Sequence, residues 1–289
     1  MLRKKLKLSS VNEQSENKSS SHQGTSVELE SNHSIYFPVP PPADASVSNK
    51  MLEVHRNLNR LLENLNFVKD PICFVYNPTI YASEPLEKYL KLYCRKEKKV
   101  LFVGMNPGPW GMCQTGIPFG EISMVKNWLL INGHVGQPNQ VCKYRIVEGF
   151  NCTQKEVSGD RFWNLMKELC TTPQRFFNNC FLYNYCPLAF MKEDGGNITP
   201  AEMQPQLKNS LEVVCDETLK EVILILKPEI VVGIGRYSEK RVSNVVKLLK
   251  QDIKVLYMPH PSPRAIYKNG WSYEANKFIT KNNLMKYFQ

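Results

Sequence analysis

Four short apolar runs, rich in β-branched and aromatic residues, constrain the fold of this 289-residue chain more than any other feature. They occupy residues 100–103, 180–185, 230–234 and 255–258, and segments with helical spacing separate them. Strands that alternate with helices are joined by right-handed crossovers, which give a parallel sheet covered on both faces. The sequence therefore predicts an α/β domain with three layers, α/β/α, around a central, mainly parallel four-stranded sheet.

Periodicity and capping signals mark the helices. Residues 51–65 carry apolar side chains at three- and four-residue spacing, which predicts an opening helix packed on the core; these side chains are Met51, Val54, Leu58, Leu61 and Leu65. Residues 161–170 have a similar apolar face. A third helix is predicted from Thr199, because Pro follows it and Glu202 completes a capping box. A fourth is expected after Ser238.

The first 45 residues differ in composition from the rest of the chain. They are rich in Ser, Asn, Glu, Lys and Pro and contain few residues able to form a core, so we predict a disordered tail before a domain at residues 46–289. The basic cluster at residues 3–7 could be a nuclear import signal, although such a pentad is common by chance and also fits a solvated tail; we expect a nuclear protein. The formal net charge of +10 favours a polyanionic partner such as nucleic acid.

The chain has nine cysteines but no C-x-x-C pair. An odd number of cysteines in a long chain without an apolar signal segment favours reduced thiols rather than a disulfide framework. Because the usual ligand spacing of zinc or iron–sulfur sites is missing, we expect no metal and no cofactor. The longest apolar runs are far shorter than a membrane span, and we expect a soluble monomer.

Polar loops with Gly or Pro follow all four predicted strands, at residues 104–109, 184–187, 233–236 and 260–264. Ligands bind at the carboxyl ends of the strands in such a sheet, so we expect these loops to converge on one edge. They supply Asn106, His260 and Arg264, but no pair of carboxylates for glycosidase-type acid and base catalysis. The expected chemistry is therefore electrostatic.

Three other functions fit parts of this pattern. Cys186 and His260 both follow strands and could form a Cys-His hydrolase, although no third orienting residue is identifiable. The basic charge and the aromatic residues also fit a nucleic-acid-binding module without catalysis. Dinucleotide binding at residues 233–235 lacks a third glycine at the required spacing.

Three motifs carry a resemblance to a known family. They lie at residues 104–109 (GMNPGP), 114–121 (QTGIPFGE) and 260–264 (HPSPR), with Gly270-Trp271 downstream. Together they resemble the single-strand-selective monofunctional uracil-DNA glycosylases, from about residue 50 to the C-terminus. Trp110 stands where the family usually has Phe, and residues 265–267 are less polar than the family's segment. The resemblance implies a DNA-repair enzyme that hydrolyses the N-glycosidic bond of uracil, 5-hydroxymethyluracil or 5-formyluracil, leaves an abasic site and so initiates base excision repair.

The resemblance also implies roles for individual residues. His260 matches the residue that stabilises charge on uracil O2, and Asn106 matches the residue that positions the attacking water. Asn184 corresponds to the amide that reads the uracil edge, since it can accept from N3–H and donate to O4. Phe119 matches the ring that stacks on the flipped base, and the Met105 backbone lies at the edge of that base.

Two loops are implied to contact DNA. Residues 264–271 match the family's wedge loop, with Arg264, Lys268 and Asn269 as DNA-binding residues. Gly195, Gly196 and Asn197 resemble a second DNA-facing loop. Such contacts would hold the duplex while the target nucleotide is extruded, which costs a few kcal/mol.

Overall fold

A computed structural model describes residues 46–289, and the predicted tail at residues 1–45 lies outside the described residues. The main sheet contains β2 (Val100–Gly104), β3 (Cys180–Asn184), β6 (Ile230–Ile234) and β7 (Lys254–Met258). Their order is β3-β2-β6-β7, and all neighbouring pairs are parallel. The predicted four-stranded parallel sheet is confirmed, with strand bounds within one residue of those expected from the apolar runs.

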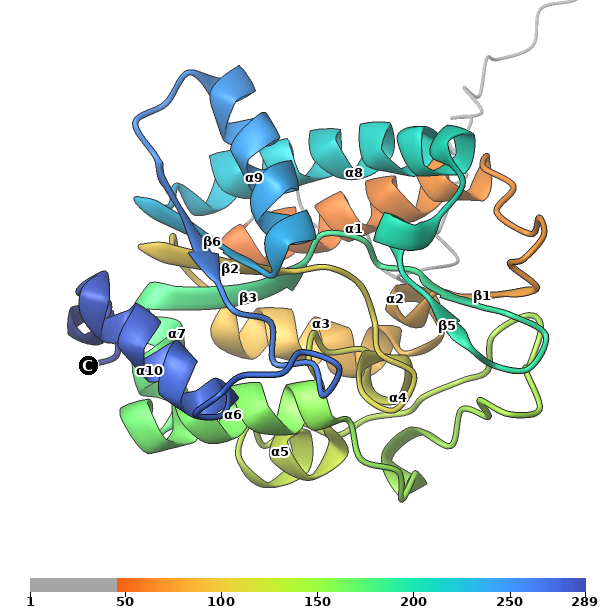
Figure 1. Cartoon of the computed structure of the whole chain (residues 1–289), viewed down its shortest axis with the longest axis horizontal. Coiled ribbons are helices and arrows are strands. Elements are labelled where there is room, and N and C mark those ends of the chain that lie inside the picture. Colours follow the sequence, from red (N-terminus) through yellow and green to blue (C-terminus); the bar gives the residue numbers. More distant parts are fainter. Residues whose placement is uncertain (1–45) are drawn as a thin grey trace, which may run out of the picture. The chain divides into compact units, whose positions relative to one another are not determined.

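Helices cover both faces of this sheet, which confirms the three-layer architecture (Figure 1). One face carries α1 (Val47–Glu63), α8 (Pro205–Leu226) and α9 (Arg236–Leu249). The other carries α3 (Ser83–Tyr93), α5 (Ile122–Asn127), α6 (Val157–Cys170), α7 (Pro173–Asn179) and α10 (Trp271–Lys281). Short helical segments complete the described chain: α2 (Pro78–Tyr81), α4 (Met112–Thr115), and the 3-10 turns η1 (Gly149–Asn151), η2 (Pro200–Glu202) and η3 (Met285–Tyr287).

Aromatic packing fills the space between the sheet and the α6 and α7 helices. Phe102 of β2 contacts Phe162 and Phe176 at ring-centroid distances of 6.0 and 5.9 Å. Trp163 is fully buried and packs edge-on against Phe162 at 5.0 Å. Such pairs add stabilisation beyond the apolar area that they bury. The core therefore lies directly beneath the strands whose ends carry the polar loops.

The opening helix begins earlier than the periodicity predicts. Ser46 caps α1, because its side chain accepts a hydrogen bond from the Asn49 backbone N–H at 3.3 Å. Leu58 is buried as expected, whereas the side chain of Leu61 is 45% exposed. Leu62 is buried in its place, since a helix turns by 100° per residue and only one of the two can face the core.

The helix predicted from Thr199 was placed too early. The capping box forms, with the Glu202 carboxylate accepting from the Thr199 backbone N–H at 2.8 Å, but it closes only the 3-10 turn η2. The α8 helix begins at Pro205, because proline has no N–H to donate within a continuing helix. The helix expected after Ser238 begins two residues earlier, at Arg236.

A second, antiparallel sheet of order β1-β4-β5 was not predicted. Its strands are β1 (Phe74–Tyr76), β4 (Ala189–Met191) and β5 (Asn197–Ile198). Strands of two or three residues are too short to show a period in the sequence. The turn between β4 and β5 contains Gly195 and Gly196, and its position matters for the site described below.

Two glycines of the segment 233–235 have structural reasons to be glycine. A Cβ atom at Gly233 would lie 2.3 Å from the backbone N and Cα of Glu239, so α9 packs directly on β6 at this point. Gly235 has a φ of +87°, which side chains disfavour. Close helix–strand packing therefore explains Gly233, and the left-handed backbone explains Gly235, without a dinucleotide site. No helix in residues 46–289 has the length and hydropathy to cross a membrane.

We expect Gly233→Ala to destabilise the fold by about 1–3 kcal/mol, because a methyl group would force α9 away from β6. Gly136→Ala is a suitable control, since the nearest atom to a Cβ there is 3.4 Å away, an ordinary contact. The free energy of unfolding, measured by denaturant titration, should fall for the first variant and change little for the second. Equal stability of the two variants would contradict the close packing.

Candidate active site

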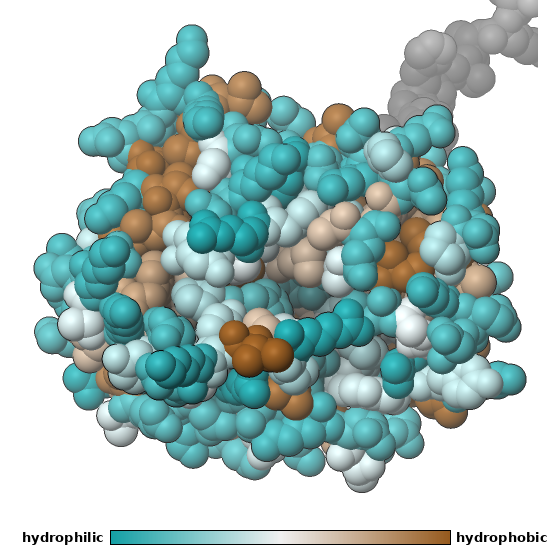
Figure 2. Space-filling model, in the orientation of Figure 1, coloured by the Kyte–Doolittle hydropathy of each residue, from teal (hydrophilic) through white to brown (hydrophobic). Residues whose placement is uncertain are grey.

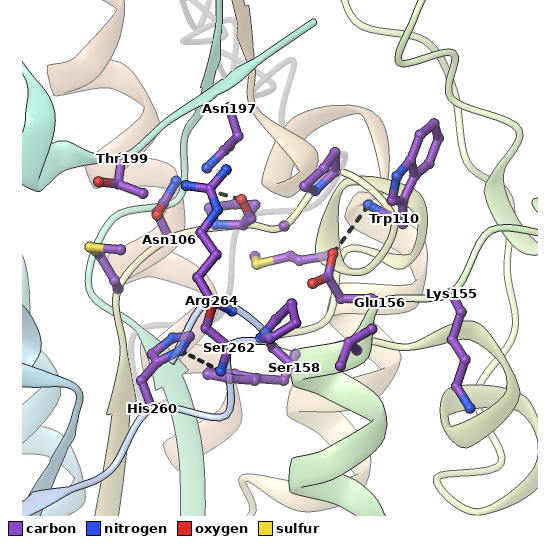
Figure 3. Close-up of a pocket in the computed structure, with 18 of the residues that line it drawn as sticks. Asn106, Trp110, Lys155, Glu156, Ser158, Asn197, Thr199, His260, Ser262 and Arg264 are labelled. Carbon is purple, nitrogen blue, oxygen red and sulfur yellow. Dashed lines mark hydrogen bonds between the residues drawn. The ribbon is translucent and has the colours of Figure 1, made fainter. Parts of the chain in front are cut away.

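A cleft of about 520 Å³ opens at the carboxyl ends of the main strands. Its walls come from the loops after β2 and β7, from residues 155–158 at the start of α6, and from the end of the β4–β5 hairpin. Figure 2 shows this face hollowed near its centre, with hydrophilic side chains around much of the rim. Figure 3 shows Asn106, Glu156, His260 and Arg264 directed toward this space.

The four predicted loops lie at the same edge of the sheet, but they do not contribute equally. Of these four loops, the ones after β2 and β7 line the cleft, and the ones after β3 and β6 do not. The loop after β6 supports the site from behind: a Cβ at Gly235 would contact the His260 ring at 3.3 Å. Arg236 turns away and stacks on the Tyr257 ring, with 3.6 Å between the guanidinium carbon and the ring centroid.

His260 is held in one orientation by its own loop. Its Nδ1 accepts a hydrogen bond from the Ser262 backbone N–H at 3.0 Å, so the proton of the neutral ring resides on Nε2. Burial lowers the pKa of His260 to about 4, so the ring is neutral at pH 7. The backbone around it is fixed by Tyr267, whose hydroxyl donates to the His260 carbonyl at 3.0 Å, and by Trp271, whose Nε1–H donates to the Pro259 carbonyl at 2.8 Å.

Asn106 is oriented by the loop after β3. Its Nδ2 donates to the Leu188 carbonyl at 3.2 Å, which leaves Oδ1 as the acceptor of this carboxamide. The same carbonyl contacts the Cys186 thiol at 3.6 Å, and the Cys186 backbone N–H donates to the Met105 carbonyl at 2.9 Å. Cys186 is fully buried and does not line the cleft with His260, so the structure does not provide the geometry of a Cys-His hydrolase.

The side chains of Asn184 and Phe119 both pack against Gly104. Parallel pairing places Gly104 beside Asn184, and a Cβ at position 104 would lie 2.3 Å from Asn184 Oδ1 and 2.5 Å from Phe119 Cε2. The Asn184 Nδ2 lies 3.2 Å from Met112 Sδ, whereas its buried Oδ1 has no hydrogen-bond partner within residues 46–289. An unsatisfied buried oxygen costs about 1–3 kcal/mol, so this atom calls for a functional explanation.

Phe119 lies between Asn184 and His260 and has a strained backbone conformation. Its φ is +52°, in the left-handed region that costs a non-glycine residue about 1–3 kcal/mol. The ring packs on Phe162 at 5.4 Å and faces His260 at 5.9 Å between ring centroids. Phe119, His260 and the Met105 loop all line the cleft, whereas Asn184 is not part of that lining and borders a separate small cavity; Met112 lines both spaces.

The residues predicted to contact DNA divide into two groups. Gly196, Asn197 and Arg264 line the cleft. Lys268 and Asn269 are exposed but lie outside the cleft lining, and Gly195 serves the hairpin turn with a φ of +74°.

Glu156 is the chief cleft residue that the sequence did not reveal. Its carboxylate accepts a hydrogen bond from the Trp110 backbone N–H at 3.3 Å (Figure 3). It fills the space beside Gly108, where a Cβ would lie 2.3 Å from Oε2. Burial raises the pKa of this carboxyl group. Only the fold brings it to the loop after β2, because Glu156 and Trp110 are 46 positions apart in the sequence.

Arg145 and Lys155 also line the cleft, and no sequence motif predicts them. They add positive charge to its rim. Within the part of the chain that the structure describes, no group of three His, Cys, Asp or Glu side chains is arranged to hold a metal ion.

Comparisons with known proteins agree with this geometry. Residues 90–284 match the model of the uracil DNA glycosylase superfamily. The chain is 41% identical to the single-strand selective monofunctional uracil DNA glycosylase of Mus musculus over 247 residues, which is 85% of this chain and 88% of that protein. It is also 41% identical to the Bos taurus protein of the same name, over 85% of this chain and 90% of that protein.

A solved structure supports the fold alone. SMUG2 of Pedobacter heparinus superposes with a TM-score of 0.61 at 16% identity and covers 83% of this chain and 98% of its own. The motifs of the cleft, the family model and the sequence identity all lead to the same assignment. The chain belongs to the uracil DNA glycosylase superfamily, within the group of single-strand-selective monofunctional uracil-DNA glycosylases.

Proposed function

We propose that this DNA glycosylase acts as a monomer in the nucleus, where it flips uracil or a 5-substituted uracil out of DNA and hydrolyses the glycosidic bond. The substituted bases are 5-hydroxymethyluracil and 5-formyluracil, and the product is an abasic site that initiates base excision repair. The observation that carries this proposal is the neutral His260 side chain, whose Nδ1 accepts from Ser262 and whose Nε2–H is therefore available in the cleft.

His260 would stabilise the leaving group. As the bond to the sugar breaks, negative charge develops on the base, and a donor already aimed at uracil O2 lowers the barrier without reorganisation. The lowered pKa of His260 means that this donor is a neutral imidazole. The cleft therefore supplies its hydrogen bond from an uncharged ring, and the hydrogen bond from Ser262 prevents the alternative tautomer.

Asn106 would position the water that attacks the sugar. Because Nδ2 is engaged by the Leu188 carbonyl, the free acceptor Oδ1 can hold one proton of a water molecule. An amide is a far weaker base than a carboxylate, so its contribution is orientation rather than proton removal. This assignment fits an enzyme whose rate depends mainly on stabilising the departing base.

Asn184 and Phe119 would select the base. The unpaired Asn184 Oδ1 can accept from uracil N3–H while Nδ2 donates to O4. Cytosine presents an acceptor at N3 and donors at its amino group, so the same amide would oppose it. The Phe119 ring supplies a stacking surface beside His260, and the Met105 backbone borders the base.

The rims of the cleft would bind DNA. Arg264 projects across the opening toward Asn106 and Asn197 (Figure 3), on a loop stiffened by Pro261 and Pro263. Its planar guanidinium can stack on bases and bond phosphates, so it suits the gap left by a flipped nucleotide. Gly196 and Asn197, which belong to the β4–β5 hairpin, also border the cleft. Lys268 and Asn269 extend the Arg264 loop outward and would contact phosphates.

An oligonucleotide panel tests the proposed function. Wild-type protein should release uracil, 5-hydroxymethyluracil and 5-formyluracil from single-stranded DNA, leave the strand uncleaved and leave cytosine in place. Asn106→Ala should release uracil on the order of 10²-fold more slowly under single-turnover conditions while still binding DNA, as expected for the loss of one preorganised group. Wild-type rates in Asn106→Ala would remove its assigned role, and release of cytosine would contradict edge reading by Asn184.

Arg264→Ala should slow uracil excision from a uracil–adenine pair far more than from single-stranded DNA. A wedge matters most where a paired base must be forced out, whereas a simple phosphate contact weakens binding to all DNA alike. The two rates are compared at equal salt with enzyme in excess, so that binding does not limit them. Equal losses on both substrates would reduce Arg264 to an ordinary phosphate ligand.

A further inference from the structure

A second surface beside the cleft combines aromatic rings with positive charge, and the motifs do not account for it. We call it the ledge; it consists of Trp110, Lys143, Tyr144 and Arg145. The Arg145 guanidinium carbon lies 4.9 Å from the centroid of the Trp110 ring, and the Lys143 ammonium lies 4.9 Å from that of Tyr144. The Tyr144 side chain is 50% exposed. Rings interleaved with cations are the usual surface for unpaired nucleotides.

Buried contacts fix the ledge to the fold, although its segment has no regular secondary structure. The hydroxyl of Tyr76, which is 1% exposed, donates to the Arg145 carbonyl at 2.9 Å and accepts from the Cys142 backbone N–H at 2.7 Å. The Arg145 Nε–H donates to the Gly195 carbonyl at 3.0 Å, on the β4–β5 hairpin. The ledge is therefore positioned before any ligand binds, which lowers the entropic cost of binding.

The ledge continues into the cleft. Trp110 and Arg145 line the same cleft as His260 and Arg264, and Figure 3 places Trp110 on the side away from His260. Neither Lys143 nor Arg145 forms an ion pair with an acidic side chain of residues 46–289. Their charges are consequently available to phosphates of a strand that passes over the rim.

We propose that the ledge is a binding subsite for unpaired DNA nucleotides next to the flipped base. One flanking base stacks on Tyr144 or against the Arg145–Trp110 pair, and the neighbouring phosphates contact Lys143 and Arg145. The inference rests on the proposed function, because it takes the strand in the cleft to be DNA. A base within a duplex has both faces covered by its neighbours, so this stacking is open only to single-stranded DNA. The ledge would thus favour unpaired substrates, whereas Arg264 would act on paired ones.

Trp110 gives a direct optical test. The chain has four tryptophans, and the other three are nearly buried: Trp128 at 6%, Trp163 at 0% and Trp271 at 3% exposure. Titration with a twelve-residue oligothymidylate, which contains no uracil, should quench the tryptophan fluorescence of the wild-type protein. Trp110→Phe should bind this strand with little change in Kd, because phenylalanine still stacks, but should lose most of the quenching.

Loss of stacking should then weaken binding selectively. Trp110→Ala and Tyr144→Ala should each raise the Kd for the oligothymidylate by about 10-fold, which is the typical effect of removing one stacked ring. The Kd of each variant for a duplex of equal length should change by less than about 3-fold, because paired bases do not stack on the ledge. Tyr273→Ala is the matched control, since Tyr273 is an equally exposed tyrosine (53%) on α10 and should leave both values unchanged.

Equal losses on single strand and duplex, or quenching that survives in Trp110→Phe, would overturn the proposal. These measurements use DNA without uracil and therefore do not depend on excision. A protein that binds through the ledge but releases no uracil would contradict the proposed function and leave the ledge in place. If the wild-type protein releases uracil but neither alanine variant changes the Kd for the oligothymidylate, the ledge is contradicted and the proposed function stands.

Discussion

The site depends on the parallel pairing of β2 with β3, which places Gly104 beside Asn184. This is the one position where the sheet, the Asn184 amide and the Phe119 ring meet, and no side chain larger than hydrogen fits there. The pairing continues beyond the strands through hydrogen bonds from Tyr185 to the Gly104 carbonyl and from Cys186 to the Met105 carbonyl, at 3.0 and 2.9 Å. Sheet geometry thereby fixes the loop that carries Asn106.

Charge is distributed in the cleft in a way that suits a departing anion. The imidazole at its inner wall is neutral, because burial lowers the pKa of His260. Within residues 46–289, Glu156 supplies the one carboxyl group on its wall, and burial raises the pKa of this group as well. Glu156 also anchors the loop after β2 through the backbone N–H of Trp110. Positive side chains occupy the rim, where Arg145, Lys155 and Arg264 lie. In the proposed function, this positive rim would attract DNA, while the neutral donor would face the base within.

The sequence predicted what depends on local patterns. The four strands, the loops at their carboxyl ends and the positions of Asn106 and His260 in those loops follow from apolar runs and from Gly and Pro punctuation. The small antiparallel sheet, Glu156 and the ledge could not be predicted, because each depends on contacts between distant segments. Glu156 meets Trp110 across 46 positions, and Tyr76 meets Arg145 across 69. The helix start at Pro205 was missed because the capping box at Thr199 is genuine but closes only one turn.

The protonation state of His260 tests the account most directly, because the proposed stabilisation of the leaving base depends on a neutral ring with its proton on Nε2. Nitrogen-15 NMR of the imidazole, assigned by comparison with a His260→Leu variant, reports both the charge and the tautomer. Assignment is needed because burial also lowers the pKa of His55 to about 4. The account predicts a neutral His260 ring at pH 7, protonated at Nε2 only, which gains a second proton only as the pH falls toward about 4. An imidazolium at pH 7, or a neutral ring protonated at Nδ1, would contradict it.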